Sequence, residues 1–215
     1  MKPLSECFLY GIVDMGYVSR ELLPTITSQL LQGGADIIQL RAKGYMPREV
    51  LAIALEIAPL CRAAGIPFIL NDHPELVREA GADGAHVGQD DLPVSEARRL
   101  AGPGAIIGKS THSVEQAIAA AAESPDYIGF GPLFATPTKP DYSPIGTEQI
   151  REIHRRLSIP IFCIGGIKRS NLQKVLNEGA RRVVIVSDLL QAEDPSRRAL
   201  DCRSLLKIQW ASQTS

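Results

Sequence analysis

Basic residues that could bind phosphate recur just after short apolar runs of this 215-residue chain. Arg41 and Lys43 follow "DIIQL", and Lys139 lies in the proline-rich stretch "FGPLFATPTKPDYSPIGTE" (130–148). Lysine and arginine neutralise phosphate charge, and arginine can donate two parallel hydrogen bonds to phosphate oxygens. A loop as long as 130–148 is usually functional or disordered. These residues therefore predict a site for a phosphate-bearing ligand.

Two carboxylates also follow short apolar runs, as the basic residues do. Asp72 ends "LND" and Asp91 lies in "GQDD". Carboxylates alone would repel a phosphate, but they can hold a hard cation. Mg²⁺ typically takes one or two carboxylates and completes its shell with phosphate oxygens and water. The set therefore predicts a diphosphate bridged by Mg²⁺. A second interpretation stays open, in which the two aspartates cap helices that begin near Pro74 and Pro93.

A second anion site is indicated closer to the end of the chain. Gly165 and Gly166 follow the apolar run "PIFCI", and Ser187 follows "RVVIV". Glycines expose backbone N–H groups, and (βα)₈ barrels frequently bind phosphate between the loops after strands seven and eight. The alternative is that the two glycines only form a tight turn. Two phosphate-bearing ligands on one face would predict a group transfer or a condensation.

Short apolar runs alternate with amphipathic stretches such as "REVLAIALEIAPLCRAA" (48–64) and "SVEQAIAAAAE" (113–123). This alternation predicts an α/β fold in which a parallel sheet closes into a single (βα)₈ TIM barrel. An open doubly wound sheet is the alternative, but the first turn "GIVDMGYVS" lacks the GxGxxG motif. We expect one domain over residues 1–208 and a frayed tail over 209–215. The predicted strands are 8–13, 36–40, 67–70, 84–87, 105–108, 126–130, 160–164 and 182–186.

Composition argues against several classes of partner. The chain has 23 Lys and Arg against 24 Asp and Glu, with a formal net charge of −1, and no basic block for nucleic acid or an anionic membrane. No apolar run reaches the length of a membrane span, and Asp14 interrupts the first one, so we expect no signal peptide. The four cysteines are widely spaced without a CxxC pair, which favours reduced thiols and a cytoplasmic location.

Several longer motifs together resemble the thiamine phosphate synthase family from "YGIVD" to "QAEDP", almost the whole chain. The resemblance implies a (βα)₈ barrel that joins hydroxymethylpyrimidine diphosphate to thiazole phosphate and releases diphosphate with Mg²⁺. It also implies a dissociative mechanism, in which C–O cleavage gives a pyrimidine-methyl cation that the thiazole nitrogen captures. The motifs are "GADIIQLRAK", "PFILNDHPELVREAGADGAHVGQDDLP", "GKSTHSVEQA", "DYIGFGPLFATPTKP", "IPIFCIGGI" and "VVIVS".

The resemblance assigns a role to each matching position. Asp72 and Asp91 would be the Mg²⁺ ligands, and His86 would lie near the pyrimidine. The segment "ATPTK" would close over bound substrates and contact both. Four residues are the expected catalytic set, namely Arg41, Lys43, Ser110 and Lys139. The pyrimidine diphosphate would be bound by Gln39, Arg41, Lys43, Asn71, Ser110 and Lys139, and the thiazole phosphate by Thr136, Thr138, Gly166, Val186 and Ser187.

Two other functions remain as alternatives. A thiazole tautomerase on the same barrel would lack the metal-site aspartates and would have histidine in place of Pro132. A non-catalytic sensor of phosphate metabolites would not require both metal ligands. Asp188 puts a negative charge beside the second phosphate site, and Lys109 stands where the family has an apolar residue. A homodimer is plausible for a barrel of this size, with small-molecule substrates as its other partners.

Overall fold

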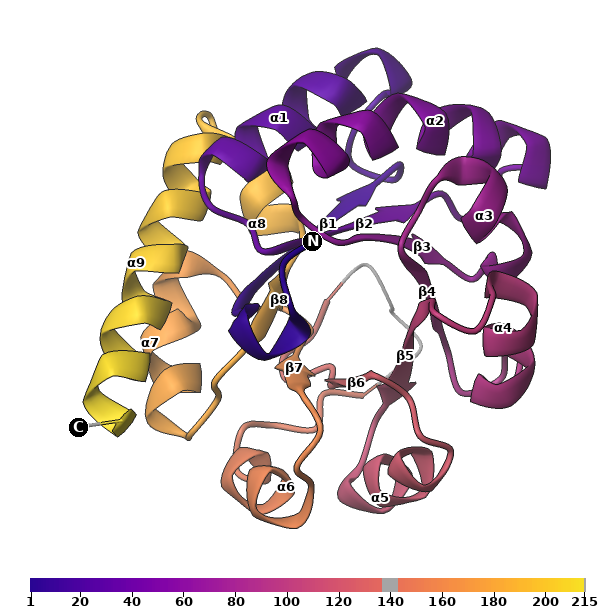
Figure 1. Cartoon of the computed structure of the whole chain (residues 1–215). Coiled ribbons are helices and arrows are strands. Elements are labelled where there is room, and N and C mark those ends of the chain that lie inside the picture. The colour runs from indigo at the N-terminus through magenta and orange to yellow at the C-terminus, as the bar shows by residue number, and fades with distance from the viewer. Residues whose placement is uncertain (137–142, 215) are drawn as a thin grey trace.

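The chain folds into a closed barrel of eight parallel strands in sequential order, which confirms the predicted (βα)₈ fold. The structure is a computed structural model, and it describes residues 1–136 and 143–214. Figure 1 looks along the barrel, with the strands at the centre and the helices around them. The strands are β1 (Leu9–Asp14), β2 (Ile37–Arg41), β3 (Phe68–Asn71), β4 (Gly84–Val87), β5 (Ile106–Thr111), β6 (Tyr127–Phe130), β7 (Ile161–Cys163) and β8 (Val183–Ile185).

The helices form where apolar residues recur at helical spacing between a start and a stop signal. In α2, Pro47 opens the helix and the Glu49 carboxylate accepts a hydrogen bond from the Met46 N–H at 2.8 Å. Gly65 ends α2 at a φ of 68°, which glycine adopts readily. The α-helices are α1 (Leu23–Gln32), α2 (Pro47–Ala64), α3 (Val77–Ala80), α4 (Val94–Ala101), α5 (Val114–Ala122), α6 (Ile150–Arg156), α7 (Arg169–Asn177), α8 (Ser187–Leu190) and α9 (Pro195–Thr214).

Helix α9 extends into the segment 209–215, which we expected to be a frayed tail. It begins at Pro195, and its backbone stays helical to Thr214. In Figure 1 this yellow helix lies beside α1 and α7, so it joins the first and last parts of the ring. None of the helices in the described part of the chain combines the length and the apolar character that a membrane span needs.

Alternation along the strands divides the core into two layers. One set of side chains packs outward against the helices, while the other fills the barrel. Inside the barrel, the rings of Tyr10, Tyr127 and Phe162 pack edge to face, with centroids 5.4–5.8 Å apart. Cys163 is fully buried on the outward layer, and all four cysteines are free thiols. Burial raises the pKa of the Cys163 thiol to about 12, so it behaves as a small core residue.

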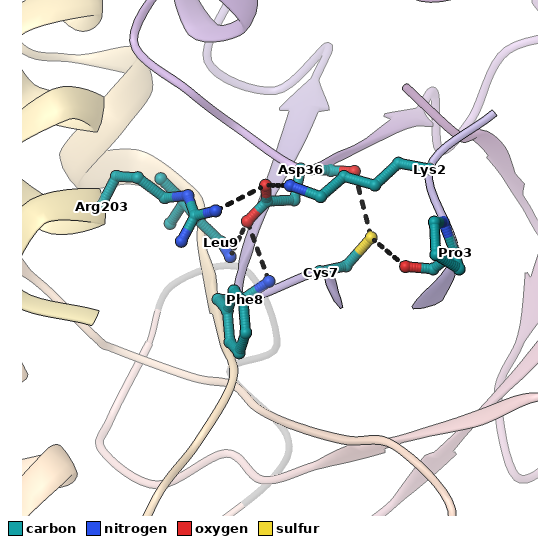
Figure 2. A network of polar contacts seen from close by, with 7 residues as sticks. All are labelled: Lys2, Pro3, Cys7, Phe8, Leu9, Asp36 and Arg203. Atoms are coloured by element: carbon teal, nitrogen blue, oxygen red, sulfur yellow. Dashed lines mark hydrogen bonds and ion pairs between the residues drawn. The ribbon is translucent and has the colours of Figure 1, made fainter. Parts of the chain in front are cut away.

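A buried carboxylate fastens the end of the barrel at which the strands begin. Asp36, just before β2, accepts hydrogen bonds from the N–H groups of Phe8 and Leu9 at 2.9 and 3.0 Å. It also pairs with Lys2 and, at 3.1 Å, with Arg203 of α9 (Figure 2). The N-terminal segment, β1 and the last helix are thereby tied to one side chain that is 3% exposed.

Replacing Asp36 by alanine should lower the free energy of unfolding by about 3–5 kcal/mol, because the buried Arg203 guanidinium loses its counter-charge. Urea unfolding at neutral pH measures this loss. The control is Asp201→Ala, which removes an exposed pair with Arg197 and should change the unfolding free energy by less than about 1 kcal/mol. Equal stabilities of the two variants would contradict a fastening role for Asp36.

Candidate active site

A pocket opens at the ends of the barrel strands that lead into helices, on the side opposite Asp36. Strand pairing aligns the polar residues there, since Asn71 lies beside His86 and Ser110 beside Gly129. Positions two apart on a strand share a face, so Gln39 and Arg41 both face the inside. The structure brings eight of the predicted substrate-binding residues to this pocket: Gln39, Arg41, Asn71, Ser110, Thr136, Gly166, Val186 and Ser187.

The remaining predicted site residues lie on the loops around this pocket or outside the described residues. Lys43, in the loop after β2, places its Nζ 2.9 Å from the Asp72 carboxylate after β3. Asp91, in the exposed loop after β4, accepts a hydrogen bond from the Gly88 N–H at 2.5 Å. Thr138 and Lys139 fall within residues 137–142, outside the described part of the chain, and so does most of the "ATPTK" segment.

Neither aspartate caps a helix in the described structure, which excludes the alternative interpretation of these residues. The short 3₁₀ helix η3 (Pro74–Leu76) is preceded by His73, and α4 is preceded by Pro93; no side chain caps either helix from those positions. The first N–H of α4 donates instead to Glu123, at 3.0 Å. The carboxylates of Asp72 and Asp91 are therefore not used as helix caps.

The backbone of Asp72 has a conformation that is uncommon for a residue other than glycine. Its φ is 65°, and its N–H donates to the carbonyl of His86 on β4 at 3.0 Å. Left-handed backbone of this kind costs free energy and recurs at functional sites, where the surrounding structure holds it. Here the β3–β4 pairing holds the Asp72 carboxylate at the rim beside Lys43.

A second ion pair, which sequence reasoning missed, fixes the guanidinium of Arg41. Its Nη1 lies 2.7 Å from the carboxylate of Asp14, which is 2% exposed and also accepts from the Gly16 N–H at 2.9 Å. Asp14 and Arg41 are opposite each other in the β1–β2 register. No local pattern connects residues this far apart, so only strand pairing could have identified Asp14 as the partner.

The floor of the pocket is a chain of hydrogen bonds between side chains from five strands. Gln39 donates to Tyr10 at 2.8 Å, and the hydroxyls of Tyr10 and Tyr127 are 2.9 Å apart. His86 connects Tyr127 to Ser110 through its two ring nitrogens, at 3.0 and 2.9 Å. Burial raises the pKa of both tyrosine hydroxyls, so they stay protonated. Sequence reasoning missed both tyrosines, although strand alternation with Ile12 places Tyr10 inside the barrel.

The glycines after β7 bring a backbone turn close to the loop after β6. Gly166 has a φ of 62°, and a Cβ there would lie 2.7 Å from the Phe134 Cβ and 2.8 Å from the Ala135 carbonyl oxygen. Only glycine fits such a position without a shift of the neighbouring backbone. Gly165, Gly166, Val186 and Ser187 line the same side of the pocket, where the loops after β7 and β8 meet.

The structure also locates the two residues that stood apart from the family pattern. The Asp188 carboxylate accepts from the Arg169 N–H at 2.8 Å and pairs with Arg198 at 2.7 Å, so it is used between α7 and α9. Lys109 is buried and lies beside Val87 and Ile128 in the strand register. It therefore alternates away from Ser110, on the face of the sheet that meets the helices.

The donor chemistry of Asp72 and Asp91 fits Mg²⁺ in its usual form. Within residues 1–136 and 143–214, no three His, Cys, Asp or Glu side chains converge as an all-protein metal cage. Mg²⁺ does not require such a cage, since it commonly binds through one or two carboxylates with substrate phosphates and water. The two carboxylates follow paired strands, and both are reachable by solvent.

The fold and the pocket define a (βα)₈ barrel with a ligand site at the carboxyl ends of its strands. Residues 9–189 match the family described as thiamine monophosphate synthase. The thiamine-phosphate synthase of Shouchella clausii is 42% identical over 214 residues, which are 99% of this chain and the whole of that protein. The chain therefore belongs to the thiamine monophosphate synthase family.

Solved structures agree with this assignment. The thiamine phosphate pyrophosphorylase from Pyrococcus furiosus superposes with a TM-score of 0.86 at 31% identity, covering 96% of this chain and 98% of that one. The 3-hexulose-6-phosphate synthase from Salmonella typhimurium has a TM-score of 0.74 at 16% identity, covering 94% and 99% of the two chains. At that identity the second likeness shows the fold alone.

Replacing Gly166 by alanine should weaken the binding of inorganic phosphate by about tenfold or more, because the added methyl group displaces the turn that carries the N–H groups. Isothermal titration calorimetry measures this affinity. Gly65→Ala is the matched control, since Gly65 has a similar φ of 68° at the end of α2, and the added Cβ would meet no other part of the described chain within 4 Å. Unchanged phosphate affinity in Gly166→Ala would show that this turn is not an anion site.

Proposed function

We propose that this chain is a thiamine-phosphate synthase, a transferase that uses two phosphate-bearing substrates. It would join 4-amino-2-methyl-5-hydroxymethylpyrimidine diphosphate to 4-methyl-5-(2-phosphoethyl)thiazole, giving thiamine monophosphate and diphosphate. One observation carries the proposal. Cations and carboxylates gather after β2 and β3, while the glycine turn follows β7, and β3 and β7 lie half a barrel apart in the closed strand order. The pocket between them would have an anion site on each side.

The diphosphate would bind on the β2–β4 side. Asp72 and Asp91 would hold Mg²⁺, which when bound would neutralise charge that develops on the departing diphosphate. Arg41 would donate hydrogen bonds to other oxygens of the diphosphate. Its guanidinium is fixed for this because it is paired with Asp14. Lys43, which is paired with Asp72, would also donate a hydrogen bond to a phosphate oxygen. Lys139 would add a cation from the segment 137–142.

The chemical step would need no nucleophile from the protein. The C–O bond of the pyrimidine diphosphate breaks with its electron pair leaving on the diphosphate, and the electron-rich aminopyrimidine stabilises the resulting methylene cation. The lone pair of the thiazole nitrogen then forms the new C–N bond. The chain contributes by orienting both rings and by stabilising the leaving charge. The enclosed pocket would also keep water from capturing the cation.

Each substrate would have its own residues. Gln39, Asn71 and Ser110 line the floor and the β2–β5 side, where they would orient the pyrimidine ring. The thiazole phosphate would bind to the backbone around Gly166 and Ser187, with Thr136 and Val186 beside it and Thr138 as a further donor. The two phosphates would thus be held apart while the two reacting atoms meet above the floor.

Diphosphate release from the purified protein tests the proposal. It should require both substrates and Mg²⁺, and Asp72→Asn or Asp91→Asn should lower kcat/KM by about 100-fold or more. Asp90→Asn is the control, because Asp90 is the exposed neighbour of Asp91 and should behave like the unchanged protein.

The alternative functions give different results in the same assay. A thiazole tautomerase would release no diphosphate, and a sensor would bind ligands without turnover. Turnover that persists without Mg²⁺, or that survives in both Asp72→Asn and Asp91→Asn, would contradict the assigned metal site.

A further inference from the structure

The hydrogen-bonded floor of the pocket connects side chains from five strands. It runs from Gln39 on β2 through Tyr10 on β1, Tyr127 on β6 and His86 on β4 to Ser110 on β5. The four contacts measure 2.8, 2.9, 3.0 and 2.9 Å, and all five residues line the pocket. These hydrogen bonds therefore connect Gln39 to Ser110 through three side chains to which the proposed chemical step assigns no role.

When His86 is neutral and each tyrosine proton lies in a hydrogen bond, proton counting leaves two polarities for this hydrogen-bonded chain. A neutral tyrosine hydroxyl carries one proton, so it can donate only one hydrogen bond. Gln39 Nε2 donates to Tyr10 in the structure, so Tyr10 must donate to Tyr127, and Tyr127 must donate to His86 Nδ1. His86 then carries its proton on Nε2 and donates it to Ser110. The Ser110 proton is left for the ligand.

The opposite polarity would change both ends of the chain together. If Gln39 turned its Oε1 toward Tyr10, each later bond would reverse, and Ser110 would donate back to His86. Ser110 would then offer the ligand only an acceptor. The two tyrosines thus couple the amide orientation of Gln39 to the tautomer of His86 and to the donor direction of Ser110.

We propose that Tyr10 and Tyr127 are positioning residues that set the polarity of the pocket floor. In the polarity of the structure, Gln39 Oε1 can accept a hydrogen bond from a ligand, and the Ser110 hydroxyl can donate one to a ligand. This pattern suits a flat heterocycle that carries an amino group beside a ring nitrogen. A 4-oxo analogue would present an acceptor and an N–H donor in place of these groups. The identity of the ring rests on the proposed function, while the polarity itself does not.

The tautomer of His86 tests the polarity without any assay of activity. Nitrogen-15 NMR of the full chain, labelled at histidine, distinguishes a protonated Nε2 from a protonated Nδ1, and the His86→Asn variant assigns the signal. We expect the Nε2–H form in the unchanged protein. Tyr127→Phe removes the donor to Nδ1, and a mixture of tautomers should appear. An Nδ1–H form in the unchanged protein, or no change in Tyr127→Phe, would overturn the proposal.

Steady-state kinetics test the effect on the substrate. Tyr127→Phe should raise KM for the pyrimidine diphosphate by about tenfold and leave KM for the thiazole phosphate unchanged. The unchanged protein should bind the free 4-aminopyrimidine alcohol more tightly than its 4-oxo analogue, and Tyr127→Phe should narrow that difference. Thr27→Val is the control, because it removes a buried hydroxyl on α1 for which the described residues provide no hydrogen-bond partner.

A double variant tests whether Tyr10 and Tyr127 act as parts of one hydrogen-bonded chain or as two independent contacts. Once the chain is cut at Tyr127, a second cut at Tyr10 should add little, so Tyr10→Phe/Tyr127→Phe should resemble Tyr127→Phe alone. Additive losses would overturn the proposal, and so would equal rises in KM for both substrates. If Tyr127→Phe failed to fold, Tyr10→Phe would be measured in its place by the same KM comparison. Absence of turnover in the unchanged protein would count against the proposed function alone, because the NMR result would still decide the polarity.

Discussion

The parallel register of a closed barrel is the constraint on which the rest of this structure depends. Each strand runs in the same direction, so residues that follow the strands are delivered to one rim whatever their distance in sequence. The β1–β2 register sets Arg41 beside Asp14, and the β3–β4 register sets Asn71 beside His86. At the other rim, Asp36 joins the N-terminal segment, β1 and α9, so the ring is tied at the end opposite the pocket.

The ion pairs of the pocket lie at its rim, and the hydrogen-bonded tyrosines lie in its floor. Two cations of the rim are paired with carboxylates, Arg41 with Asp14 and Lys43 with Asp72, and these ion pairs hold both side chains in place. The floor below them consists of hydrogen-bonded side chains, and burial keeps the two tyrosines among them protonated. A ligand with a charged end and an uncharged polar ring matches this division, because the rim can bind the charge while the floor recognises the ring.

The sequence allowed the strands and eight residues that line the pocket to be predicted, from local patterns together with the family resemblance. Apolar runs mark strands, and polar residues directly after them lie on one rim, which is how Arg41 and Ser187 were found. The family resemblance added Asn71 and Ser110. Partners across strands could not be predicted in this way. Asp14 and Tyr127 acquire their roles from register and alternation, and Glu123 reaches the start of α4 from the end of α5, so local sequence could not decide whether Asp91 caps a helix.

The central claim is that the β2–β4 side of the rim binds a metal and a diphosphate together, apart from the glycine turn after β7. A crystal soaked in Mn²⁺ and inorganic diphosphate, with the metal located by its anomalous scattering, tests this most directly. The account predicts one ion between the carboxylates of Asp72 and Asp91, bridged to a diphosphate that Arg41 also contacts. Diphosphate bound at Gly166 and Ser187, with no metal at either aspartate, would contradict it.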